Sequence, residues 1–235
     1  MNLSMNWLKD FVDTNGIDTK TFCDEMTMSG SKVEGFEKLG EDIENVVIGK
    51  VASLEKHPDS DHLWICQIED GEEAPRQIVT GAQNVHEGDL VPVALHNSYL
   101  PGGVHITKGK LRGEVSNGML CGLEELALTL NDFPNAILDG IWILNDEDCK
   151  VGDDIHDVML LNDNVVEFEI TSNRPDCLSV IGLARESAAS YGRGFSVKTP
   201  VVTEADGDIA DYISVDVEDG NLCRRYAARV VKNLK

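Results

Sequence analysis

Short strand-like runs of apolar and polar residues fill the middle of the chain. Val46 to Leu54, Leu63 to Ile68, Arg76 to Thr80 and Leu90 to Leu95 follow one another at short intervals, separated by turns that contain glycine or aspartate. Successive side chains in a strand point to opposite faces, so runs of this length suit strands with a buried face. Regularly spaced short strands with glycine turns are typical of a small antiparallel barrel. The pattern therefore predicts a five-stranded barrel of the oligonucleotide-binding (OB) type.

The two ends of the chain have a mixed helical and strand pattern. Trp7, Leu8, Phe11 and Val12 form one stripe of a helix that Asn15-Gly16 would end. About 40 residues are too few to bury a core alone, so this N-terminal segment needs a partner elsewhere in the chain. Further predicted elements are a helix capped by Thr19 that runs through Met26, a strand over 33–37, a helix over 123–130, a strand over 140–144, a strand over 165–170, a helix that Asp176 caps and Gly192 ends, and strands over 213–217 and 226–231. The predicted fold class is α+β, mainly β.

Residues 108–122 combine cations, glycines and a turn. Lys108, Lys110 and Arg112 occupy alternating positions, and on a strand they would share one face. Such a basic ridge is suited to a phosphate backbone. The alternative is a strand edge whose charges prevent aggregation. Nearby, Tyr99 could stack on a base or pack over Leu100.

Composition limits these interpretations. The net charge is −22, which opposes simple attraction to nucleic acid, although residues 46–122 carry only 10 of the 42 anions. Any RNA contact must therefore be local and sensitive to salt. The six cysteines include no CxxC pair, and His57 and His62 lack a third ligand at metal spacing, so we expect reduced thiols and no metal site. The acidic stretch around Asp146 to Asp148 lacks the ligand spacing of a calcium loop. Without a membrane-length apolar run or a secretory start, a cytoplasmic location is expected.

Several motifs carry a family resemblance. Lys110-Leu111-Arg112-Gly113 and the run from Ser116 to Cys121 resemble the signature of a tRNA-binding barrel, and the stretches 47–51, 57–63 and 77–82 resemble the same module. The barrel occurs in phenylalanyl-tRNA synthetase β subunits, in methionyl-tRNA synthetases and in free-standing tRNA-binding proteins. The resemblance implies tRNA binding through Lys108, Lys110 and Arg112, helped by Ser116 and Asn117.

A second resemblance selects among these hosts. The segments 171–179 and 182–186, with the start Asn6-Trp7-Leu8, resemble bacterial phenylalanyl-tRNA synthetase β subunits. The resemblance implies that 1–39 and 158–195 form one small α+β scaffold domain, that 40–157 is the inserted tRNA-binding OB domain, and that 196–235 is a linker with the truncated start of the editing domain. We expect Lys198 to Lys235 to be weakly held or irregularly paired.

The same resemblance frames the function. The intact family enzyme is an aminoacyl-tRNA synthetase of translation, a heterotetramer with an α subunit that attaches phenylalanine to tRNA using ATP and magnesium. No phosphate loop or catalytic triad is evident in this sequence, so we expect a non-catalytic part without a cofactor of its own. Three hypotheses remain: a tRNA-binding module, a structural module of the synthetase, and residual hydrolysis of aminoacyl-tRNA.

Overall fold

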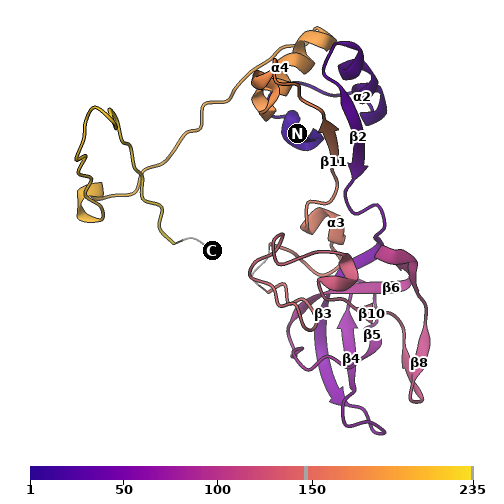
Figure 1. Ribbon diagram of the computed structural model, residues 1–235. Helices are drawn as coiled ribbons and strands as arrows, with labels where there is room; N and C mark the ends of the chain where they lie inside the picture. The colour runs from indigo at the N-terminus through magenta and orange to yellow at the C-terminus, as the bar shows by residue number, and fades with distance from the viewer. Residues whose placement is uncertain (146–147, 234–235) are drawn as a thin grey trace. The chain divides into compact units, whose positions relative to one another are not determined.

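The computed structural model describes residues 1–145 and 148–233 in two compact units, the first spanning Met1–Val197 and the second beginning at Lys198 (Figure 1). Asp146 and Glu147, in the predicted acidic turn, and Leu234 and Lys235, in the predicted 196–235 segment, lie outside the described residues. The α-helices are α1 (Met5–Leu8), α2 (Thr19–Met28), α3 (Ile155–Val158) and α4 (Val180–Tyr191).

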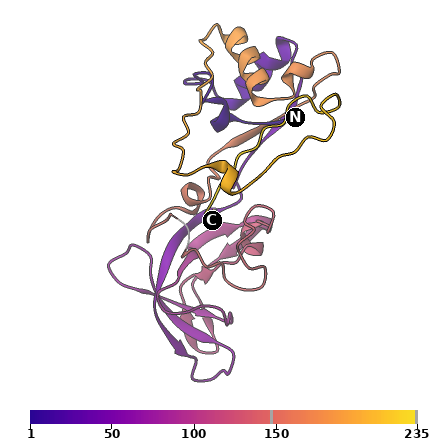
Figure 2. The same cartoon turned by 90° about the vertical axis from the view of Figure 1, so that its left-hand side faces the viewer.

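The middle of the chain forms a large, curled antiparallel sheet (Figure 2). Its path runs β10-β6-β3-β4-β5, and β7 pairs with β6 outside this path. The strands are β3 (Glu44–Lys56), β4 (Trp64–Glu69), β5 (Arg76–Thr80), β6 (Leu90–Leu100), β7 (Val104–Ile106) and β10 (Met119–Leu120). The four predicted strands are thus confirmed, and the described chain is mostly β with few helices.

The central strand β3 curls because it is irregular and closely packed. Its pairing register shifts between Val51 and Ser53 and again near its start. A Cβ at Gly49 would lie 2.6 Å from side-chain atoms of both Ile68 and Val93, so glycine lets the neighbouring strands approach there. The buried residues of the two clusters on this sheet form its core.

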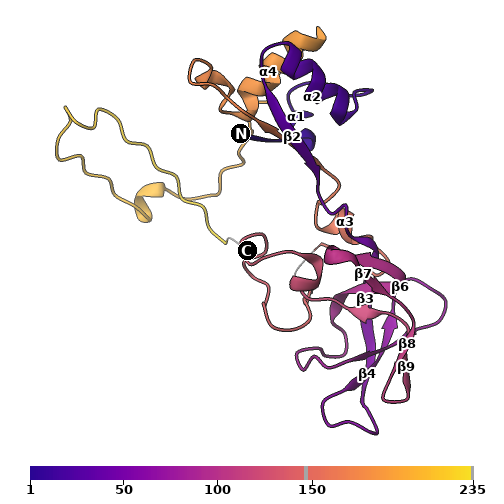
Figure 3. The same ribbon diagram turned by 45° about the vertical axis from the view of Figure 1, so that its right-hand side comes forward.

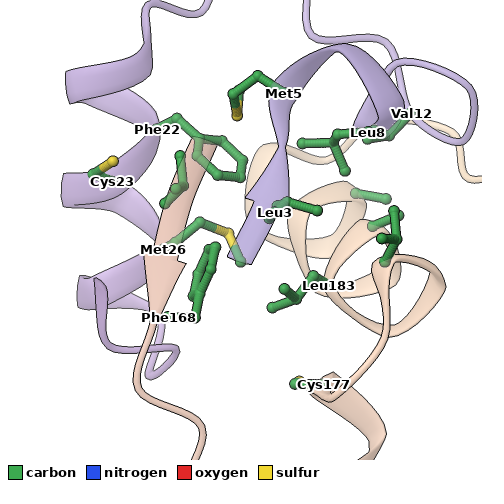
Figure 4. Close-up of a cluster of buried hydrophobic side chains, with 14 residues drawn as sticks. Leu3, Met5, Leu8, Val12, Phe22, Cys23, Met26, Phe168, Cys177 and Leu183 are labelled. Atoms are coloured by element: carbon green, nitrogen blue, oxygen red, sulfur yellow. The ribbon is translucent and has the colours of Figure 1, made fainter. Parts of the chain in front are cut away.

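The small sheet joins the two ends of the first unit. β11 (Asn164–Phe168) lies between β1 (Asn2–Ser4) and β2 (Val33–Lys38), antiparallel to both. Helices α1, α2 and α4 cover the apolar face of this sheet (Figure 4). The expected packing of the N-terminal segment on the later strand and helix is therefore present. The labelled side chains of this core are Leu3, Met5, Leu8, Val12, Phe22, Cys23, Met26, Phe168, Cys177 and Leu183.

Several predicted helix boundaries are wrong. Helix α1 ends at Leu8, well before Asn15-Gly16, because Val12 leaves the helix to bridge Phe195. Asp18, not Thr19, caps α2. Ser179, not Asp176, caps α4, since its hydroxyl accepts a hydrogen bond from the Gly182 amide.

Other predicted elements are absent from the described residues. Residues 123–130 contain only a 3₁₀ turn, Glu124–Leu126, because Ala127 adopts a left-handed conformation. Residues 140–144 are irregular, although Trp142 and Leu144 donate backbone hydrogen bonds to Cys121 and Leu90. The strand predicted over 90–95 is longer than expected, since β6 continues to Leu100.

The second unit also differs from its prediction. Residues 213–217 and 226–231 are not strands, because no described segment pairs with them. Its one described helical turn is 3₁₀, Ile209–Asp211. Nearly all described side chains from Lys198 onward are exposed, in agreement with the expectation of a weakly held segment.

Candidate nucleic-acid interface

The basic stretch forms a hairpin of its own. β8 (Gly109–Leu111) pairs with β9 (Glu114–Ser116), and the two strands extend beside the large sheet (Figure 3). Arg112 and Gly113 form the two-residue turn, with φ values of 45° and 96°. Both residues have the positive φ that a twisted hairpin turn requires. Arg112 therefore lies at the tip, and the prediction that all three cations share one strand face is wrong.

All three cations are nevertheless exposed. Lys110 pairs with Val115 across the hairpin, while the Lys108 amide donates to His96 Nδ1 at 3.0 Å. The Arg112 guanidinium donates from Nη1 to the carbonyl of Asp59 at 3.2 Å. Because all three side chains are exposed, an incoming phosphate can reach their charged groups.

A buried histidine fixes the hairpin tip. The Asp59 amide donates to His57 Nδ1 at 3.1 Å, so Nδ1 is the acceptor and the proton is on Nε2. His57 Nε2 then donates to the carbonyl of Leu111, also at 3.1 Å. His57 is 3% exposed. The sequence analysis placed His57 in a motif of the tRNA-binding barrel and weighed it as a metal ligand. It missed this clamp, which connects residues 54 positions apart.

Ser116 and Asn117 hold the base of the hairpin. Ser116 is buried, and its hydroxyl accepts from the Val79 amide at 3.1 Å and donates to the Gly118 carbonyl at 3.0 Å. The Asn117 amide donates to the Gln77 carbonyl at 2.9 Å. Both residues therefore attach the hairpin to β5, and the partly exposed Asn117 side chain lies beside it.

Tyr99 does not pack over Leu100, and its stacking on a base stays a prediction. It is 45% exposed and stacks on His105, with ring centroids 4.5 Å apart and an interplanar angle of 4°. Leu100 points the other way, into the core. The sequence analysis missed His105 because it did not identify Pro101-Gly102-Gly103 as a turn. Treating that tripeptide as a hairpin turn places Tyr99 and His105 opposite each other, as the register shows.

The thiols beside this surface are poor nucleophiles. Burial raises the pKa of Cys66 to about 11 and that of Cys121 to about 12. At neutral pH both groups remain protonated, so neither supplies the thiolate that covalent catalysis needs.

One group of described side chains has metal-like spacing, namely Asp176, Cys177 and Glu186. Arg174 forms ion pairs with both carboxylates, at 2.9 Å to Asp176 and 2.7 Å to Glu186. The hydrogen bond from Arg174 lowers the pKa of Asp176 to about 2. Magnesium prefers all-oxygen ligands, so a set with a thiol and carboxylates already paired to a guanidinium does not fit magnesium or its ATP complex. No described helix is long and apolar enough to cross a membrane.

Comparisons with known proteins give a consistent relationship. Residues 46–140 match the family model described as a putative tRNA binding domain. The phenylalanine–tRNA ligase beta subunit of Clostridium acetobutylicum is 50% identical over 100% of this chain and 29% of that protein. The corresponding subunit of Clostridium tetani is 48% identical with the same coverage. The chain thus spans less than a third of the length of these relatives.

Among solved structures, the C-terminal domain of Plasmodium vivax p43 is 27% identical to this chain. The similarity covers 49% of this chain and 61% of that one, with a TM-score of 0.34. A TM-score at this level adds no functional argument.

Proposed function

We propose that the chain binds tRNA through its β8–β9 hairpin, from the premise that residues 46–140 match the family model of a putative tRNA binding domain and that the chain is 50% identical to a phenylalanine–tRNA ligase beta subunit. We propose that Lys108, Lys110 and Arg112 contact phosphates of the tRNA. Asn117 would contact the sugar–phosphate backbone of the tRNA, and Tyr99 a base. Ser116 acts from within, by holding the hairpin on β5.

The observation that carries the proposal is the fixed, exposed position of the cations. The chain as a whole repels phosphate, with a net charge of −22. A hairpin that extends beside the sheet and is clamped at tip and base keeps its three cations in solvent. These cations then attract phosphate at short range. Salt screens the repulsion between phosphate and the more distant anions of the chain, which favours the contact.

A titration with tRNA at several salt concentrations tests this proposal. The variant Lys108→Ala/Lys110→Ala/Arg112→Ala should lose the salt-dependent part of binding, because three phosphate contacts give a log–log slope of about −2 at roughly −0.7 per contact on single strands. Folding should be unchanged, since all three side chains are exposed.

The matched control is Lys20→Ala/Lys38→Ala/Lys150→Ala, which removes the same charge from exposed lysines outside the hairpin. It should bind like the parent chain. Equal binding by the hairpin variant and the parent would leave the second candidate function, a structural module of the synthetase with little tRNA contact. The strong acidity of the chain is the observation that favours this alternative.

The fold details belong to the same proposal. The five strands on the path of the large sheet would be the five strands of an OB barrel, and the bond from the Asn117 amide to the Gln77 carbonyl links its two edges. We further propose 1–39 with 158–195 as scaffold, 40–157 as the OB domain and 196–235 as the start of the editing domain. The continuous core of the small sheet supports the first assignment.

The larger assembly is inferred from the relatives' names. As part of a phenylalanine–tRNA ligase, the chain would work with an α subunit that, with ATP and magnesium, attaches phenylalanine to tRNA in the cytoplasm. Within that assembly, the contribution that we propose for this chain is to hold tRNA.

A further inference from the structure

A cleft of about 590 Å³ lies between the β8–β9 hairpin and the end of the large sheet. Its lining includes Thr107, Gly109 and Leu111 from the hairpin and residues 138–141 from the loop around Gly140. These odd-numbered positions face the cleft, so Lys110 projects from the other face of the strand. The volume is that of a pocket for a small organic ring system.

An aromatic ring forms part of the cleft wall. His105 lines the cleft and is exposed, and one face of its ring is covered by Tyr99 at 4.5 Å. A flat ligand in the cleft can add a third ring to this stack. Nucleic-acid bases stack on aromatic side chains in this way, and each stacked base contributes about 1–3 kcal/mol.

Three acidic side chains form another part of the wall. Glu124, Glu125 and Asp139 line the cleft and are exposed. Glu125 Oε2 accepts a hydrogen bond from the Gly122 amide at 2.8 Å, which leaves Oε1 available. Within the part of the chain that the structure describes, the carboxylates of Glu124 and Asp139 form no hydrogen bond or ion pair. A group bound against these carboxylates must donate hydrogen bonds, which favours a base edge over a phosphate.

We propose that this cleft binds one unpaired guanine of an RNA strand whose phosphates lie along the hairpin cations, which rests on the proposed tRNA-binding function. Guanine presents two adjacent donors, N1–H and the N2 amino group, which match the two oxygens of a carboxylate. Adenine, cytosine and uracil each present a single donor group on the same edge. The cleft therefore reads the Watson–Crick edge while His105 supports the base by stacking.

Binding of three labelled RNA heptamers to the 235-residue chain tests the proposal. The probes are UUUGUUU, UUUAUUU and UUUUUUU, measured by fluorescence anisotropy beside intact tRNA. The guanine probe should bind about tenfold more tightly than the adenine probe, the effect of one two-point hydrogen-bond match. Their salt slopes should agree, because the phosphate contacts are shared.

Two classes of variant test the hydrogen bonds to the base and the stacking on His105 separately. Glu124→Gln/Asp139→Asn should abolish the preference for guanine over adenine, and His105→Ala should weaken the guanine probe about tenfold while leaving the salt slope unchanged. The matched controls are Glu73→Gln and His86→Ala, exposed residues outside the cleft, which should retain the preference.

The outcomes distinguish failure of the guanine site from failure of the proposed tRNA binding. Equal binding of all three heptamers with an intact salt slope would overturn the guanine site and leave the hairpin as a phosphate-binding surface. A guanine preference that survives in Glu124→Gln/Asp139→Asn would also overturn it. Failure of the parent chain to bind intact tRNA would overturn the proposed function, and the guanine site with it.

Discussion

At the scale of single residues, two glycines of the basic stretch differ in the space that a side chain would have. Gly118 has φ 138°, and a Cβ there would lie 2.6 Å from the Ala94 carbonyl oxygen. Gly113 has φ 96° with no heavy atom within 4 Å of such a Cβ. We predict that Gly118→Ala lowers the free energy of unfolding by about 2–5 kcal/mol, through strain and overpacking together.

Gly113→Ala is the matched comparison. It carries only the conformational penalty and should cost about 1–2 kcal/mol. Urea unfolding of both variants measures the difference. Equal losses would show that the contact with Ala94 relaxes freely and that φ alone decides the cost.

The sequence could not identify the carbonyl that crowds Gly118, because Ala94 comes 24 positions earlier and meets Gly118 only when β10 pairs with β6. The exposure of the cations was predictable from their charge. Their arrangement was not, since alternation holds only until a strand ends, and the turn at Arg112-Gly113 ends it.

At the scale of elements, the position of the β8–β9 hairpin depends on His57. We predict that His57→Ala leaves the Leu111 carbonyl and the Asp59 amide without their buried partner and lowers stability by about 1–3 kcal/mol. Hydrogen exchange at the Asp59 amide should accelerate, and tRNA binding should weaken because the cations lose their fixed position.

His86→Ala serves as the control, since that ring is exposed and lies outside the hairpin. Its exchange rates and tRNA affinity should match those of the parent. Unchanged exchange at Asp59 in His57→Ala would mean that the loop over 57–62 is held by other contacts.

Elements with a clear period were predictable and those that depend on tertiary contacts were not. β5 has the bounds that its alternation indicated, whereas the good helix formers of 123–130 yield only a 3₁₀ turn, since Leu123 and Leu126 are drawn into the core of the large sheet. The residues that line the cleft could not be predicted for the same reason. His105, Glu124 and Asp139 are brought together by strand pairing and loop packing, which no local pattern encodes.

At the scale of the whole first unit, the small sheet requires both ends of its chain. β1 and β2 pair with β11 and not with each other. We predict that a chain ending at residue 157 retains the large sheet but loses the N-terminal core, because Leu3 and Phe22 no longer find Phe168. Amide hydrogen exchange should show protection in β3 to β6 and none in residues 1–39.

Extension to residue 197 should restore protection of the N-terminal amides, which serves as the control. Protection of Leu3 in the shorter chain would contradict the prediction. The sequence did suggest this arrangement, since a 40-residue segment with an apolar stripe must find a partner. The strand order itself emerged only from the structure.

This pairing has a consequence for synthesis on the ribosome. The amino group of Met1 donates to the carbonyl of Phe168, 167 residues later. At a translation rate of roughly 5–20 residues per second, the first strand waits roughly 8–33 seconds for its partner. The large sheet is complete in the nascent chain before then. During that interval Leu3, Leu8 and Phe22 remain accessible to chaperones, so the start of the polypeptide is among the last parts of this unit to become native.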